Sequence, residues 1–293
     1  MNFQIIGDSC MDLTPLMQKD KQHFAAVPLM LIAGDKEIPD DASFDQASFL
    51  ELIRSTPSCP RTACPSPEDF KNAFVHSAAD YIFVITLSEQ LSGTCNAARL
   101  GKELYEESCA QAPKKVAIIN SFSGCAAETR LALLVYDLCN AGKSFEEIAA
   151  IASSYAEKRL QTFFVLQTLD TLRKNGRLSG SAALFAYVLN LKPVLFADRG
   201  EIKKFSTARG MEKALEKMCD AAIQNAVSHG VPVSDDGLPC LDRAVLVYCS
   251  CLERAEAVKA LLEKRAHFQH IDLAPARGVS TVYAADGGIV LAI

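Results

Sequence analysis

Residues 81–98 read YIFVITLSEQLSGTCNAA and contain a short apolar run, a polar loop and the start of a segment of small residues. The run Tyr81–Leu87 has the length of a buried strand, and the loop after it opens a helix. Similar apolar runs occur at Phe3–Ile6, Val116–Ile119 and Phe163–Leu169. Strands that alternate with helices in this way predict an α/β fold with a largely parallel sheet.

The length of the chain, 293 residues with 49% hydrophobic residues, is sufficient for two domains with separate cores. A charged run at Glu157–Arg159 precedes a second series of elements. This series comprises a helix near Ser181–Leu189, a turn at Asp198–Glu201, a helix from Gly210 to about Val227, a strand at Ala244–Cys249 and a helix at Glu253–Ala266. We expect an N-terminal domain at 1–160, with a mostly parallel sheet flanked by helices, and a C-terminal α/β domain at 161–293.

Capping residues mark two helix starts. Ser66-Pro67-Glu68-Asp69 and Ser144-Phe145-Glu146-Glu147 each place a capping serine before acidic residues that interact favourably with the helix dipole. The triplet Gly142-Lys143-Ser144 resembles the end of a phosphate-binding loop, but that motif requires a glycine where this chain has Asp137. We therefore expect Gly142 to end one helix and Ser144 to cap the next.

The distribution of charge argues against a nucleic-acid-binding protein. The net charge is -5, whereas proteins that bind phosphate backbones carry a surplus of Lys and Arg. The segment 173–213 is an exception, with nine basic and three acidic residues, so it carries +6 and the remainder of the chain -11. Such a segment can steer an acidic or phosphate-bearing partner, although it can also be a solvated basic face.

The cysteine content indicates a reducing compartment. The chain has eleven cysteines, an odd number, and no C-x-x-C motif, which favours free structural thiols over disulfides or a metal site. No apolar run is long enough to cross a bilayer, and the N-terminus lacks the features of a signal peptide. We expect a soluble, cytoplasmic protein with no stable membrane insertion, no metal and no cofactor.

Two hydroxyl-rich loops are candidates for binding an anion. One loop is Arg61–Pro67 and the other is Leu91–Ala98, and both are expected to open helices. Helix N-termini favour anions, so a carboxylate between the loops would meet hydroxyl donors and free backbone N–H groups. The alternative is that these hydroxyls only cap helices.

Two other patterns leave alternatives open. Asp8-Ser9-Cys10-Met11-Asp12 follows a strand, where carboxylates either face a ligand crevice or stabilise an Asx-turn and a helix cap. Ser121 and Ser123-Gly124 lack the upstream glycine of a G-x-S-x-G motif, and no histidine occurs between His76 and His229. A hydrolase or acyltransferase that uses Ser92 or Ser121 as nucleophile is therefore the weaker alternative, and a regulatory interaction module that uses the basic segment is another.

Seven motifs together resemble the DegV family, in the same order along residues 5–293. They are Asp8-Ser9-x-x-Asp12, Val27-Pro28-Leu29, the loop and helix from Thr62 to Phe70, Leu91-Ser92-Gly93-Thr94, Leu172–Ser179, Leu191–Leu195 and Thr207–Ala214. The resemblance implies a two-domain α/β protein with a lipid site between the domains, which encloses one long-chain fatty acid. The family includes the fatty-acid-binding subunits of bacterial fatty acid kinases, in which a separate kinase phosphorylates the bound carboxylate with ATP for phospholipid synthesis.

The resemblance also implies roles for individual residues. Thr62 and Ser92 would hydrogen-bond the carboxylate of the fatty acid, and Gly93 and Thr94 would shape the loop around it. The basic residues Arg177, Lys192 and Arg209 would lie near the head group or on the face that a kinase approaches. On this interpretation the protein carries the fatty acid and presents it to the kinase, and it catalyses no reaction itself.

Three positions depart from the family pattern. Thr62-Ala63-Cys64-Pro65-Ser66 has lost one hydroxyl of the usual Thr-Ser-x-Pro-Ser. Tyr283 stands where many members have the histidine of His-x-Gly-Pro-Gly, and its hydroxyl can still donate one hydrogen bond to a head group. Asn175 replaces a glycine before Gly176 and tolerates the left-handed geometry of a turn.

The tail of such a ligand would supply most of the affinity. Burial of roughly 15 methylenes at about 0.8 kcal/mol each contributes on the order of 12 kcal/mol before the costs of association. A tunnel needs apolar walls, and the expected helix at 182–189 offers apolar side chains on nearly every side. Its periodicity is equally compatible with an ordinary core helix.

Overall fold

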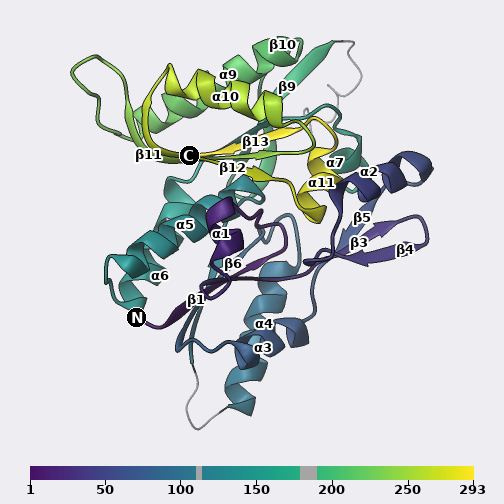
Figure 1. Ribbon diagram of the computed structural model, residues 1–293, viewed down its shortest axis with the longest axis vertical. Helices are drawn as coiled ribbons and strands as arrows, with labels where there is room; N and C mark the ends of the chain where they lie inside the picture. Colours follow the sequence, from purple (N-terminus) through teal and green to yellow (C-terminus); the bar gives the residue numbers. More distant parts are fainter. Residues whose placement is uncertain (110–113, 179–189) are drawn as a thin grey trace.

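The computed structural model describes residues 1–109, 114–178 and 190–293 (Figure 1). Its central feature is a stack of layers in which two main sheets lie on opposite sides of a buried helix, with further helices outside each sheet. The predicted α/β fold is confirmed. The helix expected near Ser181–Leu189 lies outside the described residues.

The N-terminal sheet is fully parallel, in the order β2-β1-β6-β7. Its strands are β1 (Phe3–Asp8), β2 (Phe24–Val27), β6 (Tyr81–Thr86) and β7 (Lys115–Asn120). The helices α3 (Pro67–His76) and α4 (Thr94–Ser108) pack on one face, and α5 (Ala126–Asn140) and α6 (Phe145–Lys158) lie on the other. The short helix α1 (Pro15–Lys19) lies between β1 and β2 in the chain. Because both faces are covered, the central strand β6 is apolar up to its last residue, Thr86, and almost entirely buried.

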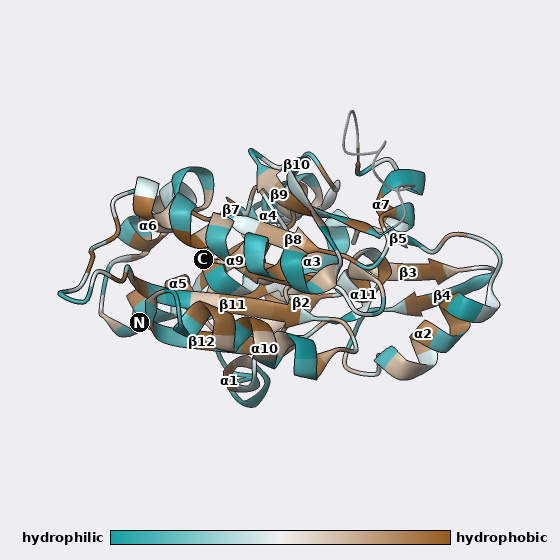
Figure 2. Ribbon diagram, turned by 90° about the horizontal axis from the view of Figure 1, so that it is seen from above, coloured by the Kyte–Doolittle hydropathy of each residue, from teal (hydrophilic) through white to brown (hydrophobic). Residues whose placement is uncertain are grey.

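The C-terminal sheet has six strands in the order β10-β9-β8-β13-β11-β12. They are β8 (Thr162–Val165), β9 (Leu191–Asp198), β10 (Glu201–Arg209), β11 (Cys240–Tyr248), β12 (His267–Pro275) and β13 (Ile289–Ala292). All neighbouring pairs are antiparallel except β11 and β12. The helices α9 (Met211–Ser228) and α10 (Leu252–Glu263) cover its outer face, and Figure 2 shows brown along β11 beside helices that alternate between teal and brown.

A third, smaller sheet was not expected from the sequence. It is antiparallel in the order β4-β3-β5, formed by β3 (Met30–Ala33), β4 (Lys36–Pro39) and β5 (Arg61–Ala63). The helix α2 (Gln46–Ser55) follows it, and α11 (Gly278–Ala284) contacts α2, β3, β5 and α7 (Asp170–Lys174). The expectation that Arg61–Pro67 is entirely loop was therefore wrong, because residues 61–63 pair with β3.

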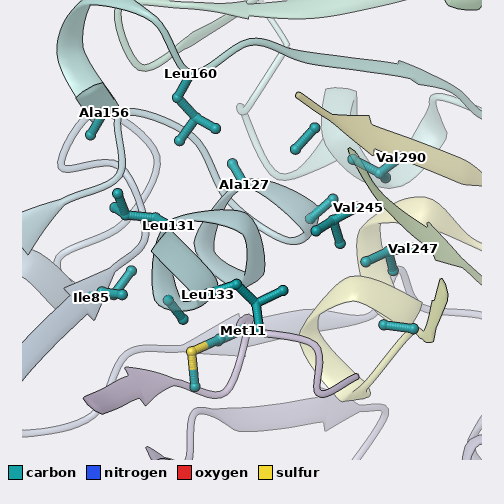
Figure 3. Close-up of a cluster of buried hydrophobic side chains, with 14 of the residues drawn as sticks. Met11, Ile85, Ala127, Leu131, Leu133, Ala156, Leu160, Val245, Val247 and Val290 are labelled. Atoms are coloured by element: carbon teal, nitrogen blue, oxygen red, sulfur yellow. The ribbon is translucent and has the colours of Figure 1, made fainter. Parts of the chain in front are cut away.

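The helix α5 lies between the two main sheets and contacts β1 and β6 on one side and β11 and β13 on the other. Figure 3 shows Ala127, Leu131 and Leu133 of this helix between Ile85 of the N-terminal sheet and Val245 of the C-terminal sheet. A helix covered on two sides needs apolar or small residues around most of its surface, and ten of its fifteen residues are buried. The helix thereby links the cores of the two halves.

Local sequence signals agree with the observed helix ends. Ser66 and Ser144 cap their helices as predicted, and each forms a capping box, with Asp69 and Glu147 respectively. Gly142 has the expected left-handed conformation, with φ of 76°. Strands up to β7 pair in the parallel or small sheets, whereas β8 and all later strands belong to the C-terminal sheet. We propose residue 160 as the domain boundary on this ground.

Candidate functional site

A cavity of about 370 Å³ lies between the inner face of the C-terminal sheet and the loops that follow the parallel strands of the N-terminal sheet. Cys10 follows β1, Leu87 and Ser92 follow β6, and Ser123 follows β7, and all four line the cavity. This is the edge where parallel α/β sheets commonly bind ligands, because loops from neighbouring strands converge there. Hydrophobic side chains make up most of the opposite walls, including Phe164, Leu166, Leu172, Ile202, Val279 and Val290.

The floor of the cavity follows strand β8. Thr162, Phe164 and Leu166 alternate along the strand direction and all line the cavity. At about 3.3 Å per residue, the four-residue separation between Thr162 and Leu166 corresponds to about 13 Å. The cavity is thus long enough for part of an extended aliphatic chain, with Leu166 at one end and Thr162 at the other.

A tyrosine and a threonine meet at the Leu166 end of the cavity. Thr62 lies on β5 and Tyr283 on α11, and their hydroxyl oxygens are 3.2 Å apart. Both side chains line the cavity and are partly buried. Each hydroxyl can donate a hydrogen bond to a carboxylate, so this pair can orient a ligand's acidic group.

Ser92 contributes a third hydroxyl beside the N-terminus of α4. Its Oγ is 2.8 Å from Thr94 Oγ1 and accepts a hydrogen bond from the Thr94 N–H. Gly93 lies close to the segment that carries Thr62, because a Cβ at position 93 would be 3.3 Å from Cys64 Sγ. Ser92, Gly93 and Cys64 line the same cavity as Thr62 and Tyr283, whereas Thr94 is fully buried behind Ser92. The two hydroxyl-rich segments therefore converge.

Arg177 also lines this cavity and connects three parts of the chain. Its Nε donates to the carbonyl oxygen of Leu91 at 3.2 Å, and a second guanidinium N–H donates to the Asn175 carbonyl oxygen. The Asn175 side chain in turn donates to the carbonyl oxygen of Pro60 at 2.8 Å. The turn after α7 thus places a positive charge beside the hydroxyl groups.

Lys192 and Arg209 lie outside the cavity lining. They stand at the same end of the β9–β10 hairpin, where Lys192 pairs with Ala208 and Arg209 with Leu191. Lys192 Nζ donates to the Gln167 carbonyl oxygen at 2.8 Å, which places it near Leu166, just after the end of β8. Burial lowers the pKa of Lys192, with a smaller contribution from Arg254. Both residues therefore lie close to the hydroxyl end of the cavity, the end with Thr62, Ser92 and Tyr283, but do not line the cavity.

Asp8 and Asp12 hold the loops of the site in place. Asp8 accepts hydrogen bonds from the N–H groups of Cys10 and Leu87, at 2.9 and 2.7 Å, so the Asx-turn alternative is correct for this residue. Asp12 accepts from the Arg277 N–H at 2.6 Å and from the Ser280 hydroxyl at 2.7 Å. Neither aspartate lines the cavity.

Burial is the largest influence on the pKa values of Asp8, Asp12 and Glu128. It raises the pKa of Asp8 to about 6 and that of Asp12 to about 7, although hydrogen bonds from backbone N–H groups oppose the shift. Burial also raises the pKa of Glu128, on α5, well above its usual range, and the neighbouring Asp8 and Asp12 add to the shift. The shift is upward because a further ionised carboxylate beside Asp8 and Asp12 would be uncompensated in this buried position.

The arrangement does not support a serine nucleophile. Ser121 Oγ accepts from the Ser123 N–H at 3.1 Å, and Ser92 Oγ contacts Thr94. Within the described residues, no histidine lines the cavity. The described ranges also contain no group of three or more His, Cys, Asp or Glu residues that could hold a metal ion.

Sequence reasoning missed the polar residues at the other end of the cavity and along its roof. Ser123 and Thr162 face each other, and Cys10, Cys125 and Ser280 line the cavity near Asp12. The only available signal was the position of Cys10 and Ser123 just after predicted strands, which is where parallel sheets collect ligand contacts.

Comparison with known proteins identifies the family. A family model described as an uncharacterised protein, DegV family, matches residues 2–293. The chain belongs to the DegV family. A DegV domain-containing protein of Streptococcus pneumoniae R6 is 30% identical over 298 residues, covering 99% of this chain and 98% of the relative.

Solved DegV structures share the whole fold. A DegV family protein from Ruminococcus gnavus, described with vaccenic acid, is 39% identical with a TM-score of 0.87, and 99% of each chain is covered. The fatty acid kinase B3 protein of Streptococcus pneumoniae, loaded with linoleic acid, is 29% identical with a TM-score of 0.82, covering 100% of this chain and 99% of its own. A DegV family protein from Eubacterium eligens, loaded with heptadecanoic acid, is 26% identical with a TM-score of 0.84, and the alignment covers 99% and 98% of the two chains. Among the described residues of this DegV chain, no helix has the length and apolar character needed to span a bilayer.

Proposed function

We propose that this DegV protein binds one long-chain fatty acid in the cavity, with its carboxylate at Thr62, Ser92 and Tyr283, and presents that carboxylate to a separate kinase. The observation that carries the proposal is the polarity of the cavity. Apolar side chains line the cavity between its two ends. Arg177 and three hydroxyls gather at one end, whereas the Ser123–Thr162 pair at the other end carries no charge. A long-chain carboxylic acid has the same division between a tail and a charged head.

The energetics fit a carrier with a tightly held tail. Each buried methylene contributes about 0.8 kcal/mol, whereas a hydrogen bond to a charged group contributes about 1.5 to 3 kcal/mol. The tail therefore supplies most of the affinity, and the hydroxyls determine which end lies beside Arg177. Three solved relatives are described with vaccenic, heptadecanoic or linoleic acid, which supports the same ligand class here.

The basic residues near the hydroxyl end support the kinase part of the proposal. Lys192 and Arg209 lie on the hairpin at this end, and Arg177 reaches the cavity itself. A partner that delivers ATP carries negative charge to this face and would be steered by these residues. The relative from Streptococcus pneumoniae is named as a B protein of fatty acid kinase.

Native mass spectrometry and solvent extraction of the purified protein test ligand binding. We expect one long-chain acid per chain, and uptake of labelled palmitate by protein from which the lipid has been removed. Folded protein that neither contains nor takes up an acyl chain would contradict the proposal. A screen with ester and acyl-phosphate substrates separates the carrier from a hydrolase, because a carrier shows no turnover above background.

The kinase step needs its own experiment. Loaded protein is incubated with ATP and a fatty acid kinase catalytic subunit, and acyl phosphate is trapped with hydroxylamine. We expect product only when both proteins are present, with a yield that falls as salt rises because attraction to the basic face is screened. Equal product formation by a charge-reversed Arg209→Glu variant would show that this face does not receive the kinase.

A further inference from the structure

The end of the cavity remote from the three hydroxyls is also polar. Ser123 and Thr162 both line it, and Ser123 Oγ donates a hydrogen bond to Thr162 Oγ1 at 2.9 Å. The two side chains are 5% and 3% exposed. A saturated acyl tail that ends in a methyl group would place apolar surface against this hydroxyl pair and gain no hydrogen bond from it.

Thr162 has an unused donor. Within the described residues, its hydroxyl takes part in the contact with Ser123, where it is the acceptor, and in no other hydrogen bond. A buried hydroxyl whose proton lacks an acceptor costs free energy, so its presence requires an explanation. The side chain lines the cavity, and an oxygen on a ligand can therefore accept this proton while it donates its own proton to Ser123 Oγ.

The cross-strand neighbours of Thr162 leave room for such an oxygen. Thr162 pairs with Ala292 on β13, and continuation of the β8–β9 register places Ala197 on its other side. Ala197 in turn pairs with Ile202 on β10. Because cross-strand partners point to the same face, the hydroxyl of Thr162 stands between two small alanine side chains rather than under bulky ones.

A second cavity, of about 670 Å³, adjoins this end and shares Ser123 and Ala197 as lining residues. Lys158 and Arg199 line it together with Glu157 and Asp198, so its formal charges balance. A balanced lining gives no preference for a charged group at the end of the chain. It is compatible with a neutral polar group, which can contact the hydroxyl pair without the desolvation cost of an ion.

We propose that the Ser123–Thr162 pair is a second polar subsite that recognises a hydroxyl group on the distal half of the acyl chain, so that this protein accepts hydroxy fatty acids as well as unsubstituted ones. This inference rests on the proposed function and specifies its substrate class. The carboxylate would lie at Thr62, Ser92 and Tyr283, and the second oxygen would lie near Thr162, about 13 Å from Leu166 along the segment that begins with β8.

The test measures affinity for palmitic acid, ω-hydroxypalmitic acid and a set of positional isomers whose hydroxyl moves along the distal half of the chain. Proteins are the wild type, Thr162→Val, Ser123→Ala and the control Thr86→Val, which changes a fully buried threonine on β6 outside the cavity lining. An unsatisfied buried hydroxyl costs about 1 to 3 kcal/mol, which corresponds to a factor of about 5 to 150 in affinity.

In the wild type, at least one hydroxy acid is expected to bind as tightly as palmitic acid or more tightly. Thr162→Val should weaken that hydroxy acid at least about fivefold relative to palmitic acid, and Ser123→Ala should act in the same direction. The control should leave the ratio unchanged. If the protein binds palmitic acid but neither Thr162→Val nor Ser123→Ala alters the ratio of the two affinities, for the hydroxy acid and for palmitic acid, the subsite alone is overturned. Failure of every acid to bind folded wild-type protein would overturn the proposed function as well.

Discussion

Replacement of Tyr283 by Phe should weaken binding of a fatty acid without abolishing it. The Tyr283 ring packs against two apolar clusters, and its hydroxyl lies 3.2 Å from Thr62 Oγ1 at the cavity wall. Phe keeps the ring and removes one donor to the carboxylate. A hydrogen bond to a charged group contributes about 1.5 to 3 kcal/mol, so Kd should rise by about 10-fold to 150-fold. Tail burial, on the order of 12 kcal/mol, is unchanged, so measurable binding remains.

Displacement of a fluorescent fatty acid is a suitable assay, because the chain contains no Trp and gives no indole signal. Each variant is measured with palmitic acid and with its methyl ester. The ester oxygen is neutral, so removal of the Tyr283 hydroxyl should weaken ester binding by only about 0.5 to 1.5 kcal/mol. The ratio of the affinity for the acid to that for the ester should therefore fall by about fivefold in Tyr283→Phe. Tyr81→Phe is the control, since Tyr81 packs on Phe145 at the start of β6, outside the cavity lining. Unchanged discrimination in Tyr283→Phe would show that this hydroxyl does not contact the head group.

Three further substitutions test the fold and its electrostatics. Asp12→Asn should reduce the loss of stability with rising pH. Burial raises the pKa of Asp12 from 3.8 to about 7, so the folded chain keeps a proton that the unfolded chain releases. The free energy of unfolding of the wild type therefore falls between about pH 4 and pH 7, by up to roughly 4 kcal/mol. Denaturant titrations across that range measure it, and equal slopes for both proteins would refute the assignment. Leu131→Ala, in the fully buried centre of α5, should cost about 2 to 5 kcal/mol in urea unfolding, and a loss below about 1 kcal/mol would contradict its core role. Ser144→Ala removes the cap of α6 and should cost about 1 kcal/mol by the same measurement, whereas no change would mean that the capping box contributes nothing.

The elements that sequence analysis predicted well depend on short-range patterns. The strand predicted at Tyr81–Leu87, observed at Tyr81–Thr86, follows from a local apolar run, and the caps at Ser66 and Ser144 follow from residues three positions apart. The family resemblance was confirmed over residues 2–293. The structure also places Thr62, Ser92, Gly93, Arg177 and Tyr283 around one cavity, while their contact with a carboxylate stays a prediction.

Features that the sequence did not predict depend on contacts between distant segments. Residues 61–63 have no strand pattern of their own, and they become β5 because they pair with residues 30–32 of β3. Ser123 and Thr162 are 39 positions apart and meet because β7 ends beside the C-terminal sheet. The roles of Asp8 and Asp12 were ambiguous for the same reason, since their partners Leu87 and Arg277 are far away in the chain.

Buried carboxylates tie the segments that carry Ser92 and Tyr283 to other parts of the chain. Asp8 holds the N–H of Leu87, at the start of the loop that carries Ser92. Asp40 accepts from the Gly278 and Val279 N–H groups, each at 2.9 Å, and so fixes the start of α11, which carries Tyr283. The backbone hydrogen bonds offset part of the free energy needed to bury these acids, whose pKa values burial still raises. Segments tied in this way have less conformational freedom to lose on ligand binding, so that hydrogen bonds to the head group contribute more fully to affinity.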